Sequence, residues 1–451
     1  MKTTLGFFVS LVALLLISNP ALAQDHVTFA KEVAPILQQH CQVCHHPGTV
    51  APMSLMTYEQ ARPWAKAIKQ RVSAREMPPW FIDRNIGVQH FANDESLSDE
   101  EIATIVKWVD SGAPQGNPAD MPAPRQFASD QEWQFGKPDL IITLPKDVIV
   151  KAHGADWWPD ILVDPGLTED RYVKAVQIIP VKGYNVIHHI RTSLVEAGEG
   201  RHSGQLDGNV SLEVGEQGVF LNEYAIGKGA DVFADGSGRL IKAGTKINFQ
   251  FHLHSSGTET PANVALGLKL YPKGYVPQHV ITSLTVGVNE IDLRPHEANV
   301  RSDAYMPLIK PARLLSFQPH LHNRGKAECL EAIYPNGKTE MLSCARFEFN
   351  WMRNYVYADD AAPLLPAGTM LHSIMWHDNS DQSRFNPDPD AQVTWGERTV
   401  DEMGSAWLSY YYMSEEDFKK EVAARKAVHH DDISQDSGPV NGDAAVRTAA
   451  R

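Results

Sequence analysis

A proline-rich stretch, PQGNPADMPAPRQF at residues 114–127, separates two parts of the chain that have different hydrophobic periods. Before it, apolar residues recur at helical spacing, as in FAKEVAPILQQHC and TYEQARPWAKAIKQRV. After it, the apolar segments are short, rich in β-branched residues and separated by Gly or Pro, as in RYVKAVQIIP and KINFQFHLH. A polar stretch dense in proline is typical of an interdomain linker. The sequence therefore predicts a helical domain followed by β-rich domains.

The predicted fold class is multidomain α plus all-β. The helical part is expected to be a small all-α domain, because Ser98 and Glu101 form a capping-box pattern and Gly112 ends the last helical segment. Two sets of short strands follow, and two antiparallel β-sandwiches of jelly-roll type are the economical interpretation. The expected boundaries are a signal peptide at 1–23, the helical domain at 24–115, a linker at 116–128, β domains at 129–288 and 289–425, and a disordered tail at 426–451.

The N-terminus has the pattern of a secretory signal peptide. Lys2 precedes an apolar run at residues 5–17, and Pro20 and the small residues up to Ala23 follow. The run is too short to span a bilayer, and no later stretch is long and apolar enough to do so. We therefore expect cleavage after Ala23, a periplasmic or secreted protein, and no membrane span.

The chain is acidic, with a formal net charge of −14 at pH 7. A negative surface repels phosphate backbones and anionic lipid headgroups. Nucleic acid is therefore not an expected partner.

A CQVCH motif lies between the first two helical segments. Two thiols three residues apart and directly followed by His, here Cys41, Cys44 and His45, are typical of covalent haem attachment, with the iron bound by the histidine. A redox CxxC pair or half of a zinc site are the alternatives, but neither requires the adjacent histidine, and no second CxxC completes a zinc site. The motif predicts one covalently attached haem c.

The distal haem ligand is less constrained by the residues. Met77 in REMPPW precedes two prolines that fix the backbone, and Met53, Met56 and His90 are rivals. The runs CQVCHHPGTVAPMSL, MPPW and IVKWVDSGAP resemble the single-haem cytochrome c domains at the front of exported bacterial multidomain enzymes. That resemblance covers about residues 27–115 and implies Met77 as the distal ligand.

The remaining two cysteines flank a hairpin signal. Asn336-Gly337 is a strong two-residue turn, and strand positions that face each other across it have numbers that sum to 673. Cys329 and Cys344 satisfy that sum, so their thiols are expected at disulfide distance in an oxidising compartment. The alternative is a pair of free buried thiols.

Two histidine clusters are candidates for binding transition metals. His188 and His189 are neighbours in a strand-like segment, so both can reach one metal only if the strand bulges or ends there, and we predict such an irregularity. Their third partner is expected from FQFHLHSSG, in which spacing alone does not choose between His252 and His254. The alternative is one core and one exposed histidine.

The second cluster is FQPHLHNRG. His320 and His322 share one face of a strand, so their imidazoles can converge on one ion. Met403, just before a later apolar strand, would add a soft thioether that favours Cu(I). His372 and His377 are candidates for orienting ligands, or else ordinary buried histidines.

Together these residues resemble a known family, the ascorbate-dependent type 2 copper monooxygenases, which include peptidylglycine α-hydroxylating monooxygenase and dopamine β-monooxygenase. The motifs are VIHHI, INFQFHLHSSG, FQPHLHNRGK and VTWGERTVDEM, and they span about residues 135–415. The chain looks like bacterial relatives with a cytochrome c domain ahead of two copper domains. The resemblance implies an electron-entry copper at His188, His189 and His252, and it favours His252 as the third ligand.

The same resemblance implies a dioxygen-activating copper at His320, His322 and Met403, which would be the catalytic residues. It also implies hydroxylation of an aliphatic C–H bond in a small-molecule or peptide substrate, with the haem and an external reductant or electron-donor protein supplying electrons. Two coppers and one haem are the expected cofactors. The alternative function is a non-enzymatic haem and copper electron-transfer or copper-binding protein.

Overall fold

The structure of the protein is a computed structural model that describes residues 27–47, 51, 53–125, 133–196, 219–225, 228–351, 353–396 and 398–429. The predicted signal peptide lies outside the described residues, as does most of the predicted tail. Within the described residues, no helix combines the length and the apolarity that crossing a membrane requires.

Short helices form the N-terminal part of the described chain. Ser98 caps the longest of them through a capping box with Glu101, as the sequence predicts. Their shared core includes Phe29, Leu37 and Trp108, all fully buried. The helices before the strands are η1 (Phe29–Val33), α1 (Ala34–His40), α2 (Tyr58–Ala61), η2 (Arg62–Trp64), α3 (Ala65–Ser73), α4 (Asp99–Asp110) and η3 (Pro118–Asp120). Two more come later in the chain, η4 (Tyr184–Val186) and α5 (Glu415–His429).

The predicted fold class is wrong, because no large N-terminal all-α domain is found in the described residues and the chain is mostly β-sheet. The longest N-terminal helix, α4, has only 12 residues. The connection between α3 and α4 is not helical: Ile82 forms a β-bridge with Ala345, and Phe91 forms one with Tyr357. Trp80, Ile82 and Phe91 join the core of the C-terminal strands. The apolar area that these residues bury against distant strands stabilises an extended conformation more than their local spacing favours a helix.

The first β unit is made of two packed sheets. One has the order β1-β10-β4-β8-β11, with β2 on β10 and β7 on β4, and the other has the order β3-β9-β5-β6. Their inner faces form one core that includes Ile190, Phe249 and Leu266. The strands are β1 (Leu140–Thr143), β2 (Val148–Val150), β3 (Asp160–Val163), β4 (Arg171–Lys182), β5 (Ile187–Val195), β6 (Val219–Ala225), β7 (Asp231–Val232), β8 (Ser237–Ile241), β9 (Lys246–Leu253), β10 (Thr260–Leu270) and β11 (His279–Val280).

The second β unit repeats this arrangement with sheets β12-β22-β15-β18 and β14-β20-β16-β17, and a small β13-β21 pair. Its core includes Phe317, Leu330 and Met375. The strands are β12 (Thr282–Val288), β13 (Asp292–Leu293), β14 (Val300–Pro307), β15 (Ala312–Leu321), β16 (Gly325–Ile333), β17 (Thr339–Arg346), β18 (Tyr355–Val356), β19 (Leu364–Leu365), β20 (Met370–His377), β21 (Val393–Thr394) and β22 (Gly404–Tyr412).

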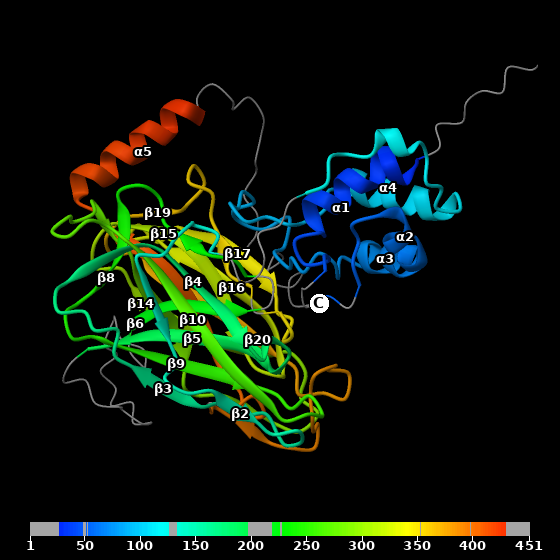
Figure 1. The fold of residues 1–451 in the computed structure, drawn as a ribbon. Coiled ribbons are helices and arrows are strands. Elements are labelled where there is room, and N and C mark those ends of the chain that lie inside the picture. The colour runs from blue at the N-terminus through cyan, green and yellow to red at the C-terminus, as the bar shows by residue number, and fades with distance from the viewer. Residues whose placement is uncertain are drawn as a thin grey trace, which may run out of the picture.

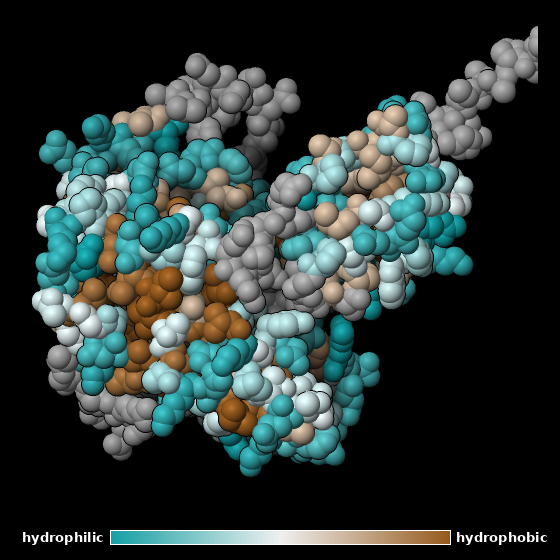
Figure 2. Space-filling view, in the orientation of Figure 1, coloured by the Kyte–Doolittle hydropathy of each residue, from teal (hydrophilic) through white to brown (hydrophobic). Residues whose placement is uncertain are grey.

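The two β units form one body, and the helices α1 to α4 lie together at one side of it (Figure 1). Apolar residues gather on the visible face of that body around β4 and β10, as Figure 2 shows. Exposed residues of this sheet include Ile141, Ile149 and Val181. The helical part is more hydrophilic in the same view.

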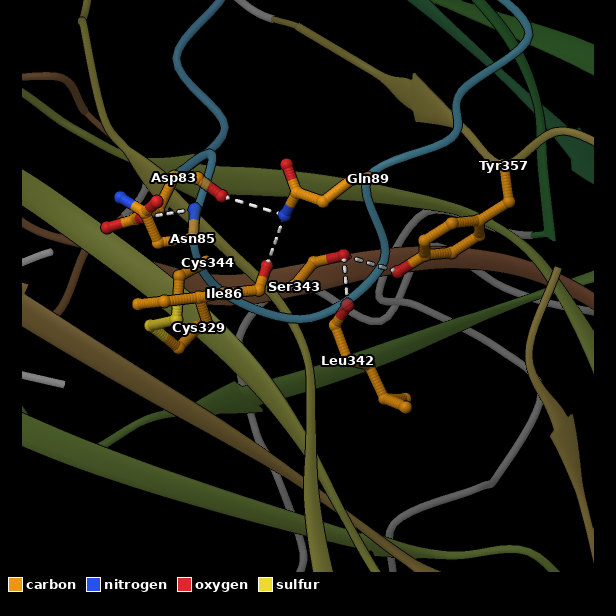
Figure 3. The surroundings of a disulfide bond; sticks show 9 residues. All are labelled: Asp83, Asn85, Ile86, Gln89, Cys329, Leu342, Ser343, Cys344 and Tyr357. Carbon is orange, nitrogen blue, oxygen red and sulfur yellow. Dashed lines mark hydrogen bonds between the residues drawn. A yellow bond between two sulfur atoms is a disulfide. The ribbon is translucent and has the colours of Figure 1, made fainter. Parts of the chain in front are cut away.

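The predicted disulfide joins Cys329 on β16 to Cys344 on β17 (Figure 3). The two cysteines face each other as predicted, but through two deviations that cancel. The turn has three residues, because Tyr334 N–H donates to the carbonyl of Lys338. A register shift next to Leu330 then restores the expected pairing. The segment before α4 covers this hairpin, since Asp83 N–H donates to the carbonyl of Cys344 at 2.8 Å.

Candidate metal centres

Three histidines converge in the first β unit. His188 and His189 lie on β5, and His252 lies on the neighbouring strand β9. Each offers one ring nitrogen, and these three atoms lie within 4.8 Å of one another. The β5–β9 register shifts between Ile187 and His189, which confirms the predicted irregularity. The bulge lets two consecutive side chains reach the same point, which a regular strand would not allow.

Hydrogen bonds fix which nitrogens face the centre of this group. Asp156 accepts from the Nε2 of His252 at 2.7 Å, so His252 directs its buried Nδ1 inward, and that atom has no hydrogen-bond partner. The Nδ1 atoms of His188 and His189 are 3.0 Å apart. His254 is not part of the group, because β9 ends at Leu253 and the alternation of faces ends with it.

The three imidazoles are held neutral. Burial lowers the pKa of His188 to about 4, and it lowers the pKa of His189 well below its ordinary value. Burial also lowers the pKa of His252, although Asp156 opposes the shift. A metal ion binds neutral imidazole, so these shifts favour metal binding over protonation near pH 7.

The second group lies on β15. His320 and His322 are 8% and 5% exposed, and their ring centroids are 5.5 Å apart. Both Nδ1 atoms are buried without a hydrogen-bond partner. Burial lowers the pKa of both residues, and that of His320 falls well below its ordinary value. Two unpartnered buried nitrogens are costly unless a ligand binds them.

The β15–β22 ladder brings the backbone of Met403 beside this group. His320 pairs with Ser405 and Leu321 with Gly404, so Met403 follows opposite His322 where the ladder ends. The carbonyl of Met403 accepts from the Nε2 of His377 at 3.2 Å. The structure therefore places all three predicted residues of the second group at one end of one sheet.

A buried carboxylate anchors this end of the sheet. Glu402 is fully buried and accepts from the backbone N–H groups of His322 and Arg324, at 3.2 and 2.9 Å. The imidazole of His377 lies 3.2 Å from the same carboxylate. The Arg324 guanidinium donates to Asn379 and to the carbonyl of Val400. These contacts tie the loop before Met403 to the end of β15.

The two histidine groups lie close enough across the contact between the β units to affect each other. A positive charge on His320 or His322 would oppose protonation of His189 and so lower its pKa. Gln318 on β15 donates to Glu223 on β6 at 2.7 Å, and both side chains are buried. The contact between the units is therefore polar and buried at this point.

The CQVCH motif forms a turn directly after α1. The N–H groups of Cys44 and His45 both donate to the carbonyl of Cys41. The Nδ1 of His45 donates to the carbonyl of Met53 at 3.0 Å, which leaves its Nε2 available. Neither Cys41 nor Cys44 is part of a disulfide, and burial raises the pKa of Cys41 to about 12.

The candidates for the distal haem ligand lie in different places. Met77 is half-buried in the bend after α3, and Met53 packs against the helical core. Met56 is half-buried, and its N–H donates to Gln60. His90 is exposed, and its Nδ1 lies 3.0 Å from the carboxylate of Asp360 in the second β unit. Met77 remains a prediction.

Sequence reasoning missed several residues that act on the histidine groups. Asp156 and Glu402 are single carboxylates far from their partners in sequence, and no local signal identifies them. Trp407 stacks on His320, yet in the sequence it is only one aromatic in an apolar strand. His372 is buried between Asp303 and Glu331, which partner both of its ring nitrogens, whereas His377 belongs to the Glu402 network.

Comparisons with known proteins give no assignment. No family model matches the chain, and no curated protein sequence matches it. The solved structure of the major capsid protein P2 from bacteriophage PM2 is 9% identical, with a TM-score of 0.28, covering 61% of this chain and 98% of that one. The structure of infectious bursal disease virus Gx strain is 7% identical, with a TM-score of 0.17, covering 68% of this chain and 87% of that one. These similarities are too low to indicate a function.

Proposed function

We propose that the protein is a copper-dependent monooxygenase that hydroxylates an aliphatic C–H bond of an organic substrate with dioxygen. The observation that supports this most is the pair of neutral histidine groups, partly or fully buried, on either side of one contact between the β units. One group has three convergent nitrogens. The other has two buried nitrogens on the strand end that lies beside the backbone of Met403, and the sequence resemblance implies these three residues as ligands.

The donor atoms fit copper. Imidazole suits both copper oxidation states, and a thioether favours the reduced one. The 3.0 Å separation between the Nδ1 atoms of His188 and His189 allows a single ion to reach both, if it bonds imidazole at about 2.0–2.1 Å as zinc does. His252 would complete the first site, and His320, His322 and Met403 would form the second. Copper bound there would supply one-electron redox chemistry and the activation of dioxygen.

The chain's own residues prepare these ligands. Asp156 fixes the tautomer of His252, because its carboxylate accepts a hydrogen bond from Nε2–H, which keeps the proton on Nε2 and leaves Nδ1 with a free lone pair. Glu402 and Arg324 hold the loop that brings Met403 to the end of β15. Burial of His252, His320 and His322 excludes bulk water from their ring nitrogens and favours their unprotonated form.

Haem attachment at Cys41, Cys44 and His45 belongs to the same proposal. The hydrogen bond from His45 to Met53 fixes the ring so that Nε2 is the nitrogen left for iron. Such a haem would pass electrons from an external reductant or donor protein to the copper sites. The proposal includes export to the periplasm or beyond the cell, where haem c and the disulfide are both compatible with the surroundings.

The alternative is a haem and copper electron-transfer protein with no substrate. It is favoured by the greater completeness of the first group, which has three convergent nitrogens, whereas the second has two. The two proposals differ in whether the second site binds copper and whether oxygen uptake yields a hydroxylated product.

The test is metal analysis together with turnover. The exported, haem-loaded chain is compared with His188→Ala, His320→Ala and the control His153→Ala, which removes an exposed histidine outside both groups. We expect two coppers per haem in the wild type and the control, and one in each site variant. Reductant-dependent oxygen uptake with a panel of C–H substrates should yield product with one added oxygen atom, labelled by ¹⁸O₂, and both site variants should lose it.

Fewer than two coppers in the wild type, or oxygen uptake without labelled product on any substrate, would contradict the monooxygenase proposal. Two coppers with haem-dependent electron transfer and no product would favour the alternative.

A further inference from the structure

Trp407 on β22 contacts His320 of the second histidine group and Arg191 on β5, the strand that carries two histidines of the first group. Its ring stacks on the imidazole of His320, with centroids 4.0 Å apart and planes 15° apart. The guanidinium of Arg191 lies over the same ring at 5.0 Å. Arg191 belongs to the first β unit and follows His189 by two residues on β5. Trp407 is thus in contact with side chains from both units.

The stack has a consequence for the orientation of His320. A histidine ligand is usually oriented by a hydrogen bond to its other ring nitrogen, as Asp156 does for His252. The Nδ1 of His320 is buried and has no such partner. A nearly parallel indole ring restricts rotation of the imidazole plane, and both ring nitrogens lie in that plane. Stacking can therefore fix the plane of the His320 ring, which is the orienting part of what the carboxylate does for His252.

Arg191 makes the position of Trp407 depend on the first β unit. A guanidinium over an indole ring stabilises the pair by about 0.5–1 kcal/mol when exposed and by about 2 kcal/mol when desolvated. Phe220 on β6 also lies 6.2 Å from the Trp407 ring. Further contacts nearby hold the units together, because Arg239 of β8 donates to Ser283 and Ser409 of the second unit.

We propose that Trp407 is a positioning residue that sets the plane of His320 and makes the second metal site depend on docking of the first β unit through Arg191. The inference rests on the proposed copper sites. In this proposal the contact between the units has two roles. It helps to assemble the His320 and His322 site, and it fixes the distance between the two sites.

The metal-free protein tests the stack. The Cε1–H signal of His320, assigned by its loss in His320→Gln, should be shifted upfield in the wild type by the ring current of Trp407. Trp407→Leu should move it toward the position of an unstacked histidine, and Trp407→Phe should retain most of the shift. An unchanged signal in Trp407→Leu overturns the proposal.

Copper binding tests the consequence. In competition with a chelator, Trp407→Leu should bind copper at the second site about 10–100-fold more weakly, the range typical for loss of a residue that orients a ligand. Its Cu(II) electron paramagnetic resonance signal should change, whereas the signal of the three-histidine site should not. Trp407→Phe should restore most of the affinity. Tyr412→Leu, which removes an aromatic residue from the far end of the same strand, is the matched control and should match the wild type.

The dependence on the first unit is tested with Arg191→Leu. This variant should weaken the second site in the same direction, and in a Trp407→Leu background it should add little, because both changes act through one contact. Equal second-site affinity and spectra in the wild type, Trp407→Leu and Arg191→Leu overturn the positioning role while leaving the proposed function intact. A wild-type chain that binds no copper at His320 and His322 overturns both.

Discussion

The buried carboxylate of Glu402 offers the sharpest test of how the second histidine group is built. It accepts hydrogen bonds from the backbone N–H groups of His322 and Arg324, and all three residues are at most 5% exposed. Replacing Glu402 with Ala leaves these two donors buried without an acceptor. Each such donor costs about 1–3 kcal/mol, so we expect Glu402→Ala to lower the free energy of unfolding by about 2–6 kcal/mol.

Glu402→Gln separates charge from hydrogen bonding. Its amide keeps one acceptor oxygen but presents an NH₂ group to the second donor, so one of the two bonds is lost. We therefore expect a smaller loss of about 1–3 kcal/mol. Glu259→Ala, at an exposed turn of the first β unit, is the control and should change stability by less than about 0.5 kcal/mol.

The assay is guanidinium denaturation of the metal-free protein, followed by tryptophan fluorescence, with the transition of the second β unit compared among the variants. The expected order of midpoints is control, then Glu402→Gln, then Glu402→Ala. If Glu402→Ala unfolds at the same denaturant concentration as the control, the carboxylate does not anchor the loop before Met403, and the reasoning is refuted.

Three further outcomes are expected. His252→Ala should abolish copper binding at the first site while His254→Ala leaves it intact, as measured by copper content; the reverse result would show that β9 continues past Leu253. Gly87→Ala should lower the unfolding midpoint, because Gly87 has φ of +66° and an added Cβ would lie 2.2 Å from the carbonyl oxygen of Leu342; we expect a cost of at least about 1–3 kcal/mol. The metal-free protein should lose stability as pH falls from 6.5 toward 4, because the unfolded chain binds a proton that half-buried His188, with its pKa of about 4, does not. His188→Gln should show a smaller loss in urea midpoints between pH 7 and 5.

Sequence patterns predicted local structure where residues close together in the chain determine it. The capping box at Ser98 and the turn at Asn336-Gly337 are examples, although the hairpin reached its pairing through a longer turn and a compensating register shift. The bulge at His188 was predicted from chemistry, because two consecutive histidines reach one point only where the strand is irregular.

The error in the fold class has a clear physical origin. Residues between α3 and α4 were assigned to an all-α domain, yet Trp80, Ile82 and Phe91 are buried among strands more than two hundred positions later in the chain. A sequence window sees the apolar residues but not the surface that will bury them. The same limit explains why Asp156, Glu402 and Trp407 were not recognised.

The sequence by itself identified which residues are candidates for binding metal and haem, because histidine, methionine and cysteine have their ligand chemistry wherever they lie. It also determined the change from helical to β spacing after the proline-rich stretch. Only the tertiary structure decided that His252 and not His254 joins His188 and His189, since that depends on where one strand ends. It also decided that Trp407 and Arg191 connect the two groups, because contacts between sheets arise from packing of segments that are distant in the chain.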